Sequence, residues 1–251
     1  MKKFILIPAR LSSKRLPNKV LLDLKGKTIL QRVYEQCNQV KDVKVFITTD
    51  SKKVEESCLK FTQNIIMTSV NHKSGTERII EAVENLDYDL LINVQGDEPF
   101  INPLLIESLF KLLEHKKDFV VTVCEQLSSF EDLFDPNTVK VVKDINHNAL
   151  YFSRSAIPHV RDVAELPKDE DKFFENTCFY KHVGIYGYNK TFIKKYSSLA
   201  ISPLEEQEVL EQLRILENGF KIKVLETEYK SLGIDTKDDY EKALELIHES
   251  S

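Results

Sequence analysis

The sequence is poor in glycine, and its glycines do not form the patterns that wrap a phosphate group in backbone amides. Only 7 glycines occur in 251 residues, and Gly26 is the first of them. A P-loop requires Gly-x-x-x-x-Gly-Lys-Ser/Thr and a dinucleotide-binding fold requires Gly-x-Gly-x-x-Gly, and neither pattern is present. A dehydrogenase is therefore disfavoured, and any recognition of phosphate must rest mainly on charged side chains.

Cysteines are scarce and scattered. The 4 cysteines form no Cys-x-x-Cys pair and lie far apart, at Cys37, Cys58, Cys124 and Cys178. This spacing indicates neither a zinc site nor a disulfide framework. We therefore expect reduced thiols that are mostly buried.

Long apolar runs are also absent. The apolar run after Lys2 and Lys3 ends at Arg10, which is too short for a signal peptide. No stretch approaches the roughly 18 apolar residues that cross a bilayer. The 35 lysines and arginines are interspersed with 40 aspartates and glutamates, so a broad basic face for nucleic acid is missing. We therefore expect a cytoplasmic protein that binds a small molecule, and neither nucleic acid nor a membrane.

What the sequence does contain is an alternation of short β-branched runs with segments of helical spacing. Starting with a strand, we predict strands and helices in turn at Phe4–Ile7, Ile29–Val40, Val43–Thr48, Lys52–Phe61, Asn64–Met67, Glu77–Leu86, Leu90–Val94, Leu104–His115 and Phe119–Val123. This rhythm is typical of βαβ units. It predicts an α/β fold with a mainly parallel central sheet and helices on both faces.

The pattern changes near Val139. Two short runs flank a turn-rich segment and predict a hairpin, and a polar segment after it resembles an exposed or mobile insertion: Val139–Val142, Ala149–Phe152 and Arg161–Lys172. The remaining predicted elements are a strand, a helix opened by Ser202-Pro203-Leu204-Glu205 and closed by Gly219, a second strand and a last helix: His182–Tyr188, Ser202–Gly219, Lys221–Leu225 and Lys237–His248. We expect residues 1–251 to form one domain with an antiparallel excursion at about residues 135–200.

Four cations follow the first predicted strand directly: Arg10, Lys14, Arg15 and Lys19. Open α/β sheets bind ligands at the carboxyl ends of their strands, so this cluster predicts a ligand rich in phosphate. Arginines would grip phosphate oxygens bidentately, and Lys19 would present a compact charge to a reacting phosphate. The alternative is a basic loop that is merely solvated.

Two aspartates follow other apolar segments. Asp97 comes after Gly96 at the tip of a predicted strand, where it could hold magnesium against phosphate oxygens or simply cap a turn. Asp235 and Thr236 precede the last helix, and taken alone they are better explained by helix capping with Asp239. Taken together, Asp97 and Asp235 could share one magnesium that also binds a nucleotide.

Other polar residues interrupt apolar segments or begin a helix. Ser74 and Glu77 form a capping-box pattern, and an additional ligand role is possible for Ser74, Gly75 and Arg78. Farther along, four side chains would suit a polyhydroxylated acidic substrate: Arg154, His182, Tyr186 and Glu211. A hydrogen-bonded core residue is the usual alternative for a single histidine or tyrosine in such a strand.

These motifs together resemble the family of 3-deoxy-manno-octulosonate (Kdo) cytidylyltransferases, also called CMP-Kdo synthetases. The resemblance covers nearly the whole chain in order, through blocks that include Ile7-Pro8-Ala9-Arg10, Arg15-Leu16-Pro17, Ser74-Gly75-Thr76-Glu77-Arg78, Asn93-Val94-Gln95-Gly96-Asp97-Glu98-Pro99, Pro136-Asn137, Tyr151-Phe152-Ser153-Arg154, Gly184-Ile185-Tyr186-Gly187-Tyr188, Leu210-Glu211-Gln212-Leu213-Arg214 and Gly233-Ile234-Asp235-Thr236.

The resemblance implies a single-domain fold like that of nucleotide-diphospho-sugar transferases, generally as a homodimer. It implies that CTP and Kdo are joined to give CMP-Kdo and pyrophosphate for lipopolysaccharide synthesis, with Mg²⁺ as cofactor. It also implies that the excursion at about residues 135–200 serves dimerisation and sugar binding.

The resemblance further implies roles for individual residues. The catalytic and triphosphate-binding group is Arg10, Arg15, Lys19 and Asp97; the cytidine-binding group adds Pro8, Ala9, Ser74 and Gly75; the metal ligands are Asp97 and Asp235. The sugar pocket is implied to contain Arg78, Gln95, Arg154, His182, Tyr186, Glu211 and Gln212.

One departure from the family pattern concerns the basic loop. Asn18 stands where glycine is common, and asparagine fits there if the backbone is left-handed. Two alternatives remain at this stage: a cytidylyltransferase for another acidic sugar, such as an 8-amino Kdo analogue or a sialic acid, and a nucleotide-binding regulator without catalysis. The joint presence of Lys19, Asp97 and Asp235 argues against the regulator.

Overall fold

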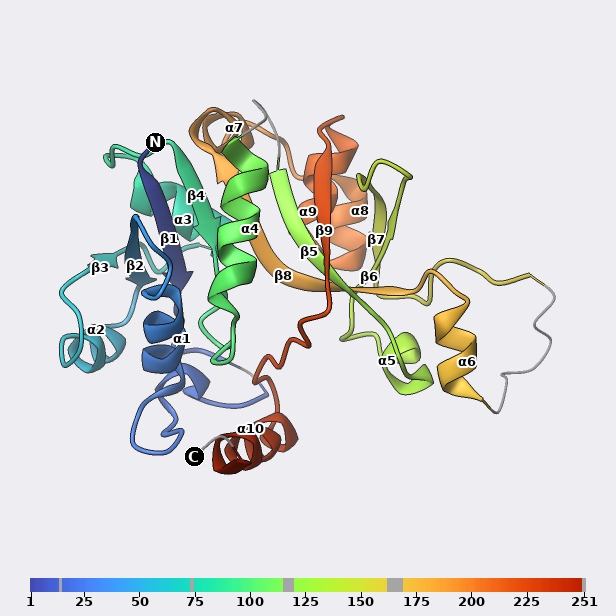
Figure 1. The fold of residues 1–251 in the computed structure, drawn as a ribbon. Coiled ribbons are helices and arrows are strands. Elements are labelled where there is room, and N and C mark those ends of the chain that lie inside the picture. Colours follow the sequence, from blue (N-terminus) through green and yellow to red (C-terminus); the bar gives the residue numbers. More distant parts are fainter. Residues whose placement is uncertain (14, 73–74, 115–119, 162–168, 250–251) are drawn as a thin grey trace.

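A mixed sheet forms the centre of the computed structural model, which describes residues 1–13, 15–72, 75–114, 120–161 and 169–249 (Figure 1). Within these residues the sheet has nine strands, seven of them in the order β3-β2-β1-β4-β8-β5-β9, with β6 and β7 branching off at β8. The strands are β1 Lys3–Pro8, β2 Val43–Thr49, β3 Ile65–Met67, β4 Leu90–Asn93, β5 Val120–Gln126, β6 Lys140–Lys143, β7 Ala149–Ser153, β8 Tyr180–Asn189 and β9 Ile222–Thr227.

Helices cover both faces of this sheet (Figure 1). They are α1 Ile29–Cys37, α2 Lys52–Cys58, α3 Gly75–Val83, α4 Pro103–Glu114, α5 Phe130–Phe134, α6 Glu170–Glu175, α7 Lys190–Tyr196, α8 Pro203–Glu208, α9 Glu211–Glu217 and α10 Lys237–Glu249, with a short 3₁₀ helix η1 at Lys19–Leu21. The α/β class and the alternation of elements expected from the sequence are confirmed over the described residues.

The alternation of side chains along β1 explains how one strand supports both layers. Ile5 and Ile7 are fully buried in the core that α1 and α4 complete. Phe4 and Leu6 face the opposite way, into the core completed by α3, α7 and α9. Successive side chains of a strand point to opposite faces, so a strand with apolar residues at every position must be covered on both sides.

The direction of β8 breaks the parallel arrangement. Strands β1, β2, β3 and β4 are mutually parallel, and β5 is parallel to β9. Strand β8 runs antiparallel to both β4 and β5, so it is inserted in the middle of the sheet. The predicted excursion therefore includes a central strand as well as the hairpin of β6 and β7, whose turn is held by Asp144 Oδ1 accepting from the Asn146 and Asn148 amides at 2.8 Å.

The single helix predicted between Ser202 and Gly219 is wrong. The chain forms α8 and α9, separated at Val209 and Leu210, and Val209 has a left-handed backbone with φ of 54°. The reversal lets the Arg214 guanidinium pair with both carboxylate oxygens of Glu205 at 2.6 Å. Two short helices thus lie side by side where the periodicity indicated one long helix.

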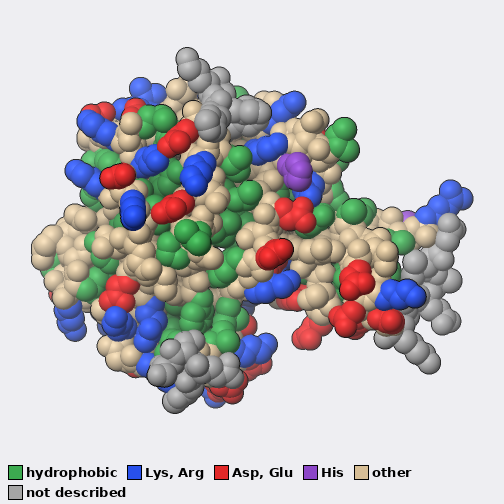
Figure 2. All heavy atoms as spheres, in the orientation of Figure 1, with side chains coloured by type: hydrophobic (Ala, Val, Ile, Leu, Met, Phe, Trp, Pro, Cys, Tyr) green, Lys and Arg blue, Asp and Glu red, His purple; other side chains and the backbone are tan. Residues whose placement is uncertain are grey.

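The remaining expectations concern the polar segment and the cysteines. Residues 162–168 of the predicted insertion lie outside the described residues, and the segment just after them begins α6, which with α5 forms a lobe beside the main body. Figure 2 shows acidic and basic side chains interspersed on this face, and a notch between the body and the lobe. All cysteines are free; Cys178 is exposed and the other three are buried, as expected. In the part of the chain that the structure covers, no helix is both long and apolar enough to cross a membrane.

Candidate active site

The basic loop that follows β1 folds across the carboxyl ends of the parallel strands. Asn18 has φ of 56° and ψ of 25°, a left-handed backbone in which asparagine can replace glycine. This turn starts η1, and Lys19 is the first residue of that helix. Lys14, the second cation of the predicted cluster, lies outside the described residues. The loop thereby points Lys19 at the end of β4.

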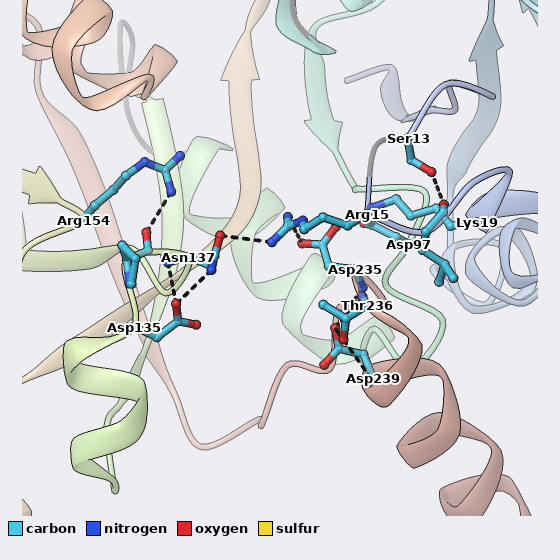
Figure 3. Close-up of polar contacts among 12 residues, drawn as sticks. Ser13, Arg15, Lys19, Asp97, Asp135, Asn137, Arg154, Asp235, Thr236 and Asp239 are labelled. Carbon is cyan, nitrogen blue, oxygen red and sulfur yellow. Dashed lines mark hydrogen bonds and ion pairs between the residues drawn. The ribbon is translucent and has the colours of Figure 1, made fainter.

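Two carboxylates from distant parts of the chain meet at Lys19 (Figure 3). The Lys19 Nζ donates to Asp97 Oδ2, in the loop after β4, and to Asp235 Oδ1 at 2.6 Å, just before α10. The Ile234 amide donates to the Asp97 carbonyl at 2.9 Å, which ties the two segments together. Burial alone would lower the pKa of Lys19, but the two carboxylates outweigh it and raise that pKa above its ordinary value.

The capping of α10 fixes the position of Asp235. Asp239 Oδ2 accepts from the Thr236 amide at 2.8 Å, and Thr236 Oγ1 accepts from the Asp239 amide at 3.2 Å. Capping with Thr236 and Asp239 is therefore real, as the sequence indicated. It leaves the Asp235 carboxylate available, and this carboxylate binds Lys19 and, at 2.9 Å, the Arg15 guanidinium.

The donor set is suited to magnesium. Asp97 and Asp235 present hard carboxylate oxygens to one cationic centre, the Lys19 ammonium, so the space between them already accommodates a positive charge. Mg²⁺ is commonly held by one or two carboxylates together with substrate phosphates. Within the described residues no group of three or more His, Cys, Asp or Glu side chains is arranged to hold a metal ion.

The neighbour of Asp97 is a buried acid. Glu98 is 8 % exposed, and its burial, together with the charge of Asp97, raises its pKa to about 8. A Cβ on Gly233 would lie 3.2 Å from Glu98 Oε1, so glycine leaves room for this carboxyl next to Asp97. Burial therefore favours the protonated form of Glu98 near neutral pH and reduces the negative charge beside Asp97.

A cavity of about 250 Å³ lies beside this site and contains most of the predicted sugar-binding residues. Its lining includes Gly75, Gln95, His182, Tyr186, Glu211 and Gln212. Asn93, the last residue of β4, also lines the cavity. No role was predicted for this residue, because an asparagine at the end of a strand has no distinctive spacing. The volume is below the range of about 300–1,000 Å³ for drug-sized ligands. It suits a single sugar rather than a nucleotide.

The electrostatics of this cavity favour neutral hydrogen-bonding groups. Burial lowers the pKa of His182 to about 3, so the imidazole is uncharged at neutral pH, and it lies 2.9 Å from Thr122 Oγ1. Burial also raises the pKa of Tyr186 well above its ordinary value, which keeps the phenol protonated. The cavity can therefore offer hydroxyl, imidazole and amide groups to a polyhydroxylated ligand.

A second, wider cavity of about 630 Å³ adjoins the first. Arg15, Asp97 and Asp235 line it, and Gln95, Val139, His182 and Gly184 line both cavities. A group bound at the carboxylates would consequently lie next to a ligand in the smaller cavity. The two cavities therefore share part of their lining.

The predicted cytidine residues lie near the end of β1. A Cβ on Gly75 would be 3.6 Å from Pro8 Cγ, and a Cβ on Gly96 would be 3.0 Å from the Pro8 carbonyl oxygen. Ala9 is fully buried. Ser74 lies outside the described residues. The structure thus brings Pro8, Ala9 and Gly75 close together, and Gly75 also lines the smaller cavity.

Three predicted arginines have protein partners. Arg78 is fully buried, with its guanidinium bonded to Asp50 at 2.6 Å and to Thr68, and it is not among the residues that line either cavity. Arg154 bonds to backbone carbonyl oxygens and likewise does not line them. Burial, with the nearby charge of Arg78, lowers the pKa of Arg10, which still remains a cation.

Comparisons with known proteins agree with this arrangement. The profile of the cytidylyltransferase family matches residues 4–223. A 3-deoxy-manno-octulosonate cytidylyltransferase of Francisella tularensis subsp. holarctica is 46% identical over 250 residues, covering 97% of this chain and 98% of the relative. The enzyme of the same name from Thermodesulfovibrio yellowstonii is 45% identical over 251 residues, covering 96% of each chain.

Solved structures show the same fold. A CMP:2-keto-3-deoxy-manno-octonic acid synthetase complexed with CTP superimposes with a TM-score of 0.90 at 39% identity, over 100% of both chains. A 4-diphosphocytidyl-2C-methyl-D-erythritol synthase from Anaerococcus prevotii shares the fold alone, with a TM-score of 0.61 at 15% identity over 98% of this chain and 96% of that one. The chain therefore belongs to the cytidylyltransferase family, and within it to the 3-deoxy-manno-octulosonate cytidylyltransferases.

Proposed function

We propose that this protein transfers the cytidylyl group of CTP to Kdo, forming CMP-Kdo and pyrophosphate. The observation that carries the proposal is the convergence of Lys19, Asp97 and Asp235 beside a sugar-sized cavity, in a chain whose relatives bear this activity in their names. The acceptor hydroxyl would attack the α-phosphorus while pyrophosphate leaves. Such a displacement depends on positioning and on charge neutralisation more than on a covalent nucleophile.

The basic loop would bind the triphosphate. Arg15 and Lys19 now hold carboxylates, and both can turn to phosphate oxygens when the nucleotide enters. Asp97 and Asp235 would hold Mg²⁺, which when bound neutralises charge on the phosphates. Pro8, Ala9 and Gly75 would contact the cytidine, and Arg10 behind them adds positive potential at the same end of β1.

The acceptor would bind in the smaller cavity. Gln95, His182, Tyr186, Glu211 and Gln212 present groups that can bond to sugar hydroxyls. The predicted contacts of Arg78 and Arg154 with the acceptor carboxylate would require each guanidinium to exchange its present partners for the ligand. Both contacts stay predictions.

The cellular setting follows from the same proposal. CMP-Kdo would serve lipopolysaccharide synthesis in the cytoplasm, where CTP and Mg²⁺ are abundant. We further propose that the protein is a homodimer, with residues of the excursion at about 135–200 at the interface.

A direct assay tests the activity. Pyrophosphate release is measured with each of the four nucleoside triphosphates against Kdo, its 8-amino analogue and a sialic acid, with Mg²⁺ and with chelator. We expect release with CTP and Kdo in Mg²⁺, and none with chelator. Preference for the 8-amino analogue or a sialic acid would assign a different acidic sugar, and no release with any pair would refute nucleotidyl transfer.

A further inference from the structure

A hydrogen bond between Arg15 and Asn137 joins two loops that line the wider cavity, and no role was predicted for Asn137. Asn137, in the loop between α5 and β6, accepts a hydrogen bond through Oδ1 from the Arg15 guanidinium at 3.1 Å. Its amide orientation is set from behind, because Nδ2 donates to Asp135 Oδ1 at 2.9 Å and the Asn137 backbone amide donates to the same oxygen at 2.8 Å. Figure 3 shows this side chain directed at Arg15.

The same loop is held on its other side by Arg154. The Arg154 Nη1 donates to the Pro136 carbonyl at 2.9 Å, one residue before Asn137. The loop is also held from below, since the buried Lys140 Nζ donates to the Asp135 carbonyl at 2.9 Å and to the Thr138 carbonyl at 2.5 Å. The side chains of Arg15, Arg154 and Lys140 therefore hold residues 135–138 through four hydrogen bonds.

The other nitrogens of the Arg154 guanidinium donate hydrogen bonds to the break between α8 and α9. Its Nε donates to the Glu208 carbonyl at 2.7 Å and its Nη2 to the Val209 carbonyl at 3.4 Å. The Glu208 carboxylate accepts two further hydrogen bonds, from the Arg154 backbone amide at 2.9 Å and from Ser153 Oγ at 2.6 Å. Val209 has the left-handed backbone noted above, so the carbonyls of this break need outside donors.

The break forms one wall of the acceptor cavity. Val209, Leu210, Glu211 and Gln212 all line it. The position of this wall depends on Arg154, the position of Arg154 depends on the Pro136 carbonyl, and that loop is bonded to Arg15. A continuous chain of hydrogen bonds thus runs from the triphosphate end of the site to the wall of the sugar cavity.

We propose that Asn137 and Arg154 are positioning residues that couple the triphosphate site to the acceptor cavity. This inference rests on the proposed function, because it assigns the two ends of the chain to CTP and to the sugar. Arg15 is the member that changes partner when phosphate binds, and Arg154 is the member that holds the cavity wall. Neither Asn137 nor Arg154 needs to touch a substrate for this role.

The test is steady-state kinetics of two variants and their combination. Asn137→Ala removes the bond to Arg15, and Arg154→Lys keeps the charge but cannot span three carbonyls. We expect Asn137→Ala to raise the KM for Kdo at saturating CTP about fivefold, the worth of one net hydrogen bond. The KM for CTP at saturating Kdo should rise by a similar factor, because coupling between two sites is reciprocal. We expect the double variant to be no worse than Arg154→Lys, because members of one chain give non-additive effects.

Controls separate this inference from folding and from the proposed function. Asn176→Ala removes another exposed asparagine, whose side chain bonds locally to the Lys172 carbonyl at 2.8 Å, and should leave both KM values unchanged. Thermal unfolding of every variant identifies misfolding, and Asn137→Ala alone remains decisive if Arg154→Lys unfolds. An unchanged KM for Kdo in Asn137→Ala, or additive effects in the double variant, would overturn the coupling. Absence of pyrophosphate release by the wild type would instead overturn the proposed function.

Discussion

The Lys19 Nζ donates a hydrogen bond to Asp235 Oδ1 at 2.6 Å, although the two residues are 216 positions apart in the sequence. The same ammonium contacts Asp97. The contact shows that the first loop and the last helix close one site, because η1 presents the lysine and the cap of α10 presents the aspartate.

Replacing either carboxylate should stop turnover without unfolding the protein. We expect Asp97→Asn and Asp235→Asn each to lower the kcat for pyrophosphate release at least about 100-fold, because each removes a charge that is proposed to hold Mg²⁺ against phosphate. Circular dichroism and thermal unfolding would check the fold. Asp238→Asn, on the exposed first turn of α10, is the matched control and should keep its activity. Near-normal, magnesium-dependent turnover by Asp97→Asn would refute its role as a ligand.

Removing the Lys19 ammonium should leave the repulsion between the Asp97 and Asp235 carboxylates uncompensated. We expect Lys19→Met to lose activity and to lower the thermal midpoint by about 2–4 °C, because two carboxylates are left facing each other. Added Mg²⁺ without nucleotide should recover this midpoint in the variant and have little effect on the wild type. Lys237→Met removes an exposed lysine two residues from Asp235 in the sequence, and it should neither lose activity nor lower the thermal midpoint. Equal responses of Lys19→Met and wild type to Mg²⁺ would contradict this account.

The lowered pKa of His182 predicts loss of stability in acid. Between about pH 3 and 6.5 the unfolded histidine binds a proton that the folded one does not, so stability is complete above pH 6.5 and falls as the pH drops. We expect about 1–2 kcal/mol less stability at pH 5 than at pH 7.5 from this group. Denaturant unfolding of the wild type and of His182→Asn at pH 5 and pH 7.5 measures this loss of stability. The difference between the two pH values should be smaller in His182→Asn, and an equal difference would exclude this source.

A glycine in the centre of β8 should resist enlargement. A Cβ on Gly187 would approach Val121 Cγ2 to 2.5 Å and Leu113 Cδ1 to 2.8 Å. We expect Gly187→Ala to lower the free energy of unfolding by about 1–3 kcal/mol, the usual result of overpacking. Gly184→Ala is the control in the same strand, since its Cβ would meet only Gln95 Cγ, at 3.7 Å. Similar denaturation midpoints for the two variants would show that β8 can shift to make room.

The sequence predicted the elements well where one pattern determined them. The apolar strand at Phe4–Ile7 and the cap at Thr236 each depend on neighbouring residues, and both are present. The break at Val209 was missed, because a β-branched residue is a poor candidate for a left-handed backbone. The contacts that hold it come from elsewhere in the chain: Arg214 pairs with Glu205, and Arg154 donates to the Glu208 and Val209 carbonyls.

The site was harder to predict than the fold. The resemblance identified residue types, but it could not show that Arg78 faces Asp50 or that Arg154 spans three carbonyls. Asp50 lies 28 positions from Arg78, and the three carbonyls lie 18, 54 and 55 positions from Arg154, so both sets of partners follow from the course of the chain in space. Asn137 was missed for the same reason, since beside Pro136 it indicates only a turn.

Strand β8 has β4, β5 and β6 as neighbours, so three pairings depend on its alignment at once. It also carries His182 and Tyr186 to the acceptor cavity. Gaining or losing one residue here would turn every following side chain to the opposite face. A side-chain exchange along this strand would thus change the lining of the cavity and keep the three pairings, whereas a change in its length would disturb all three.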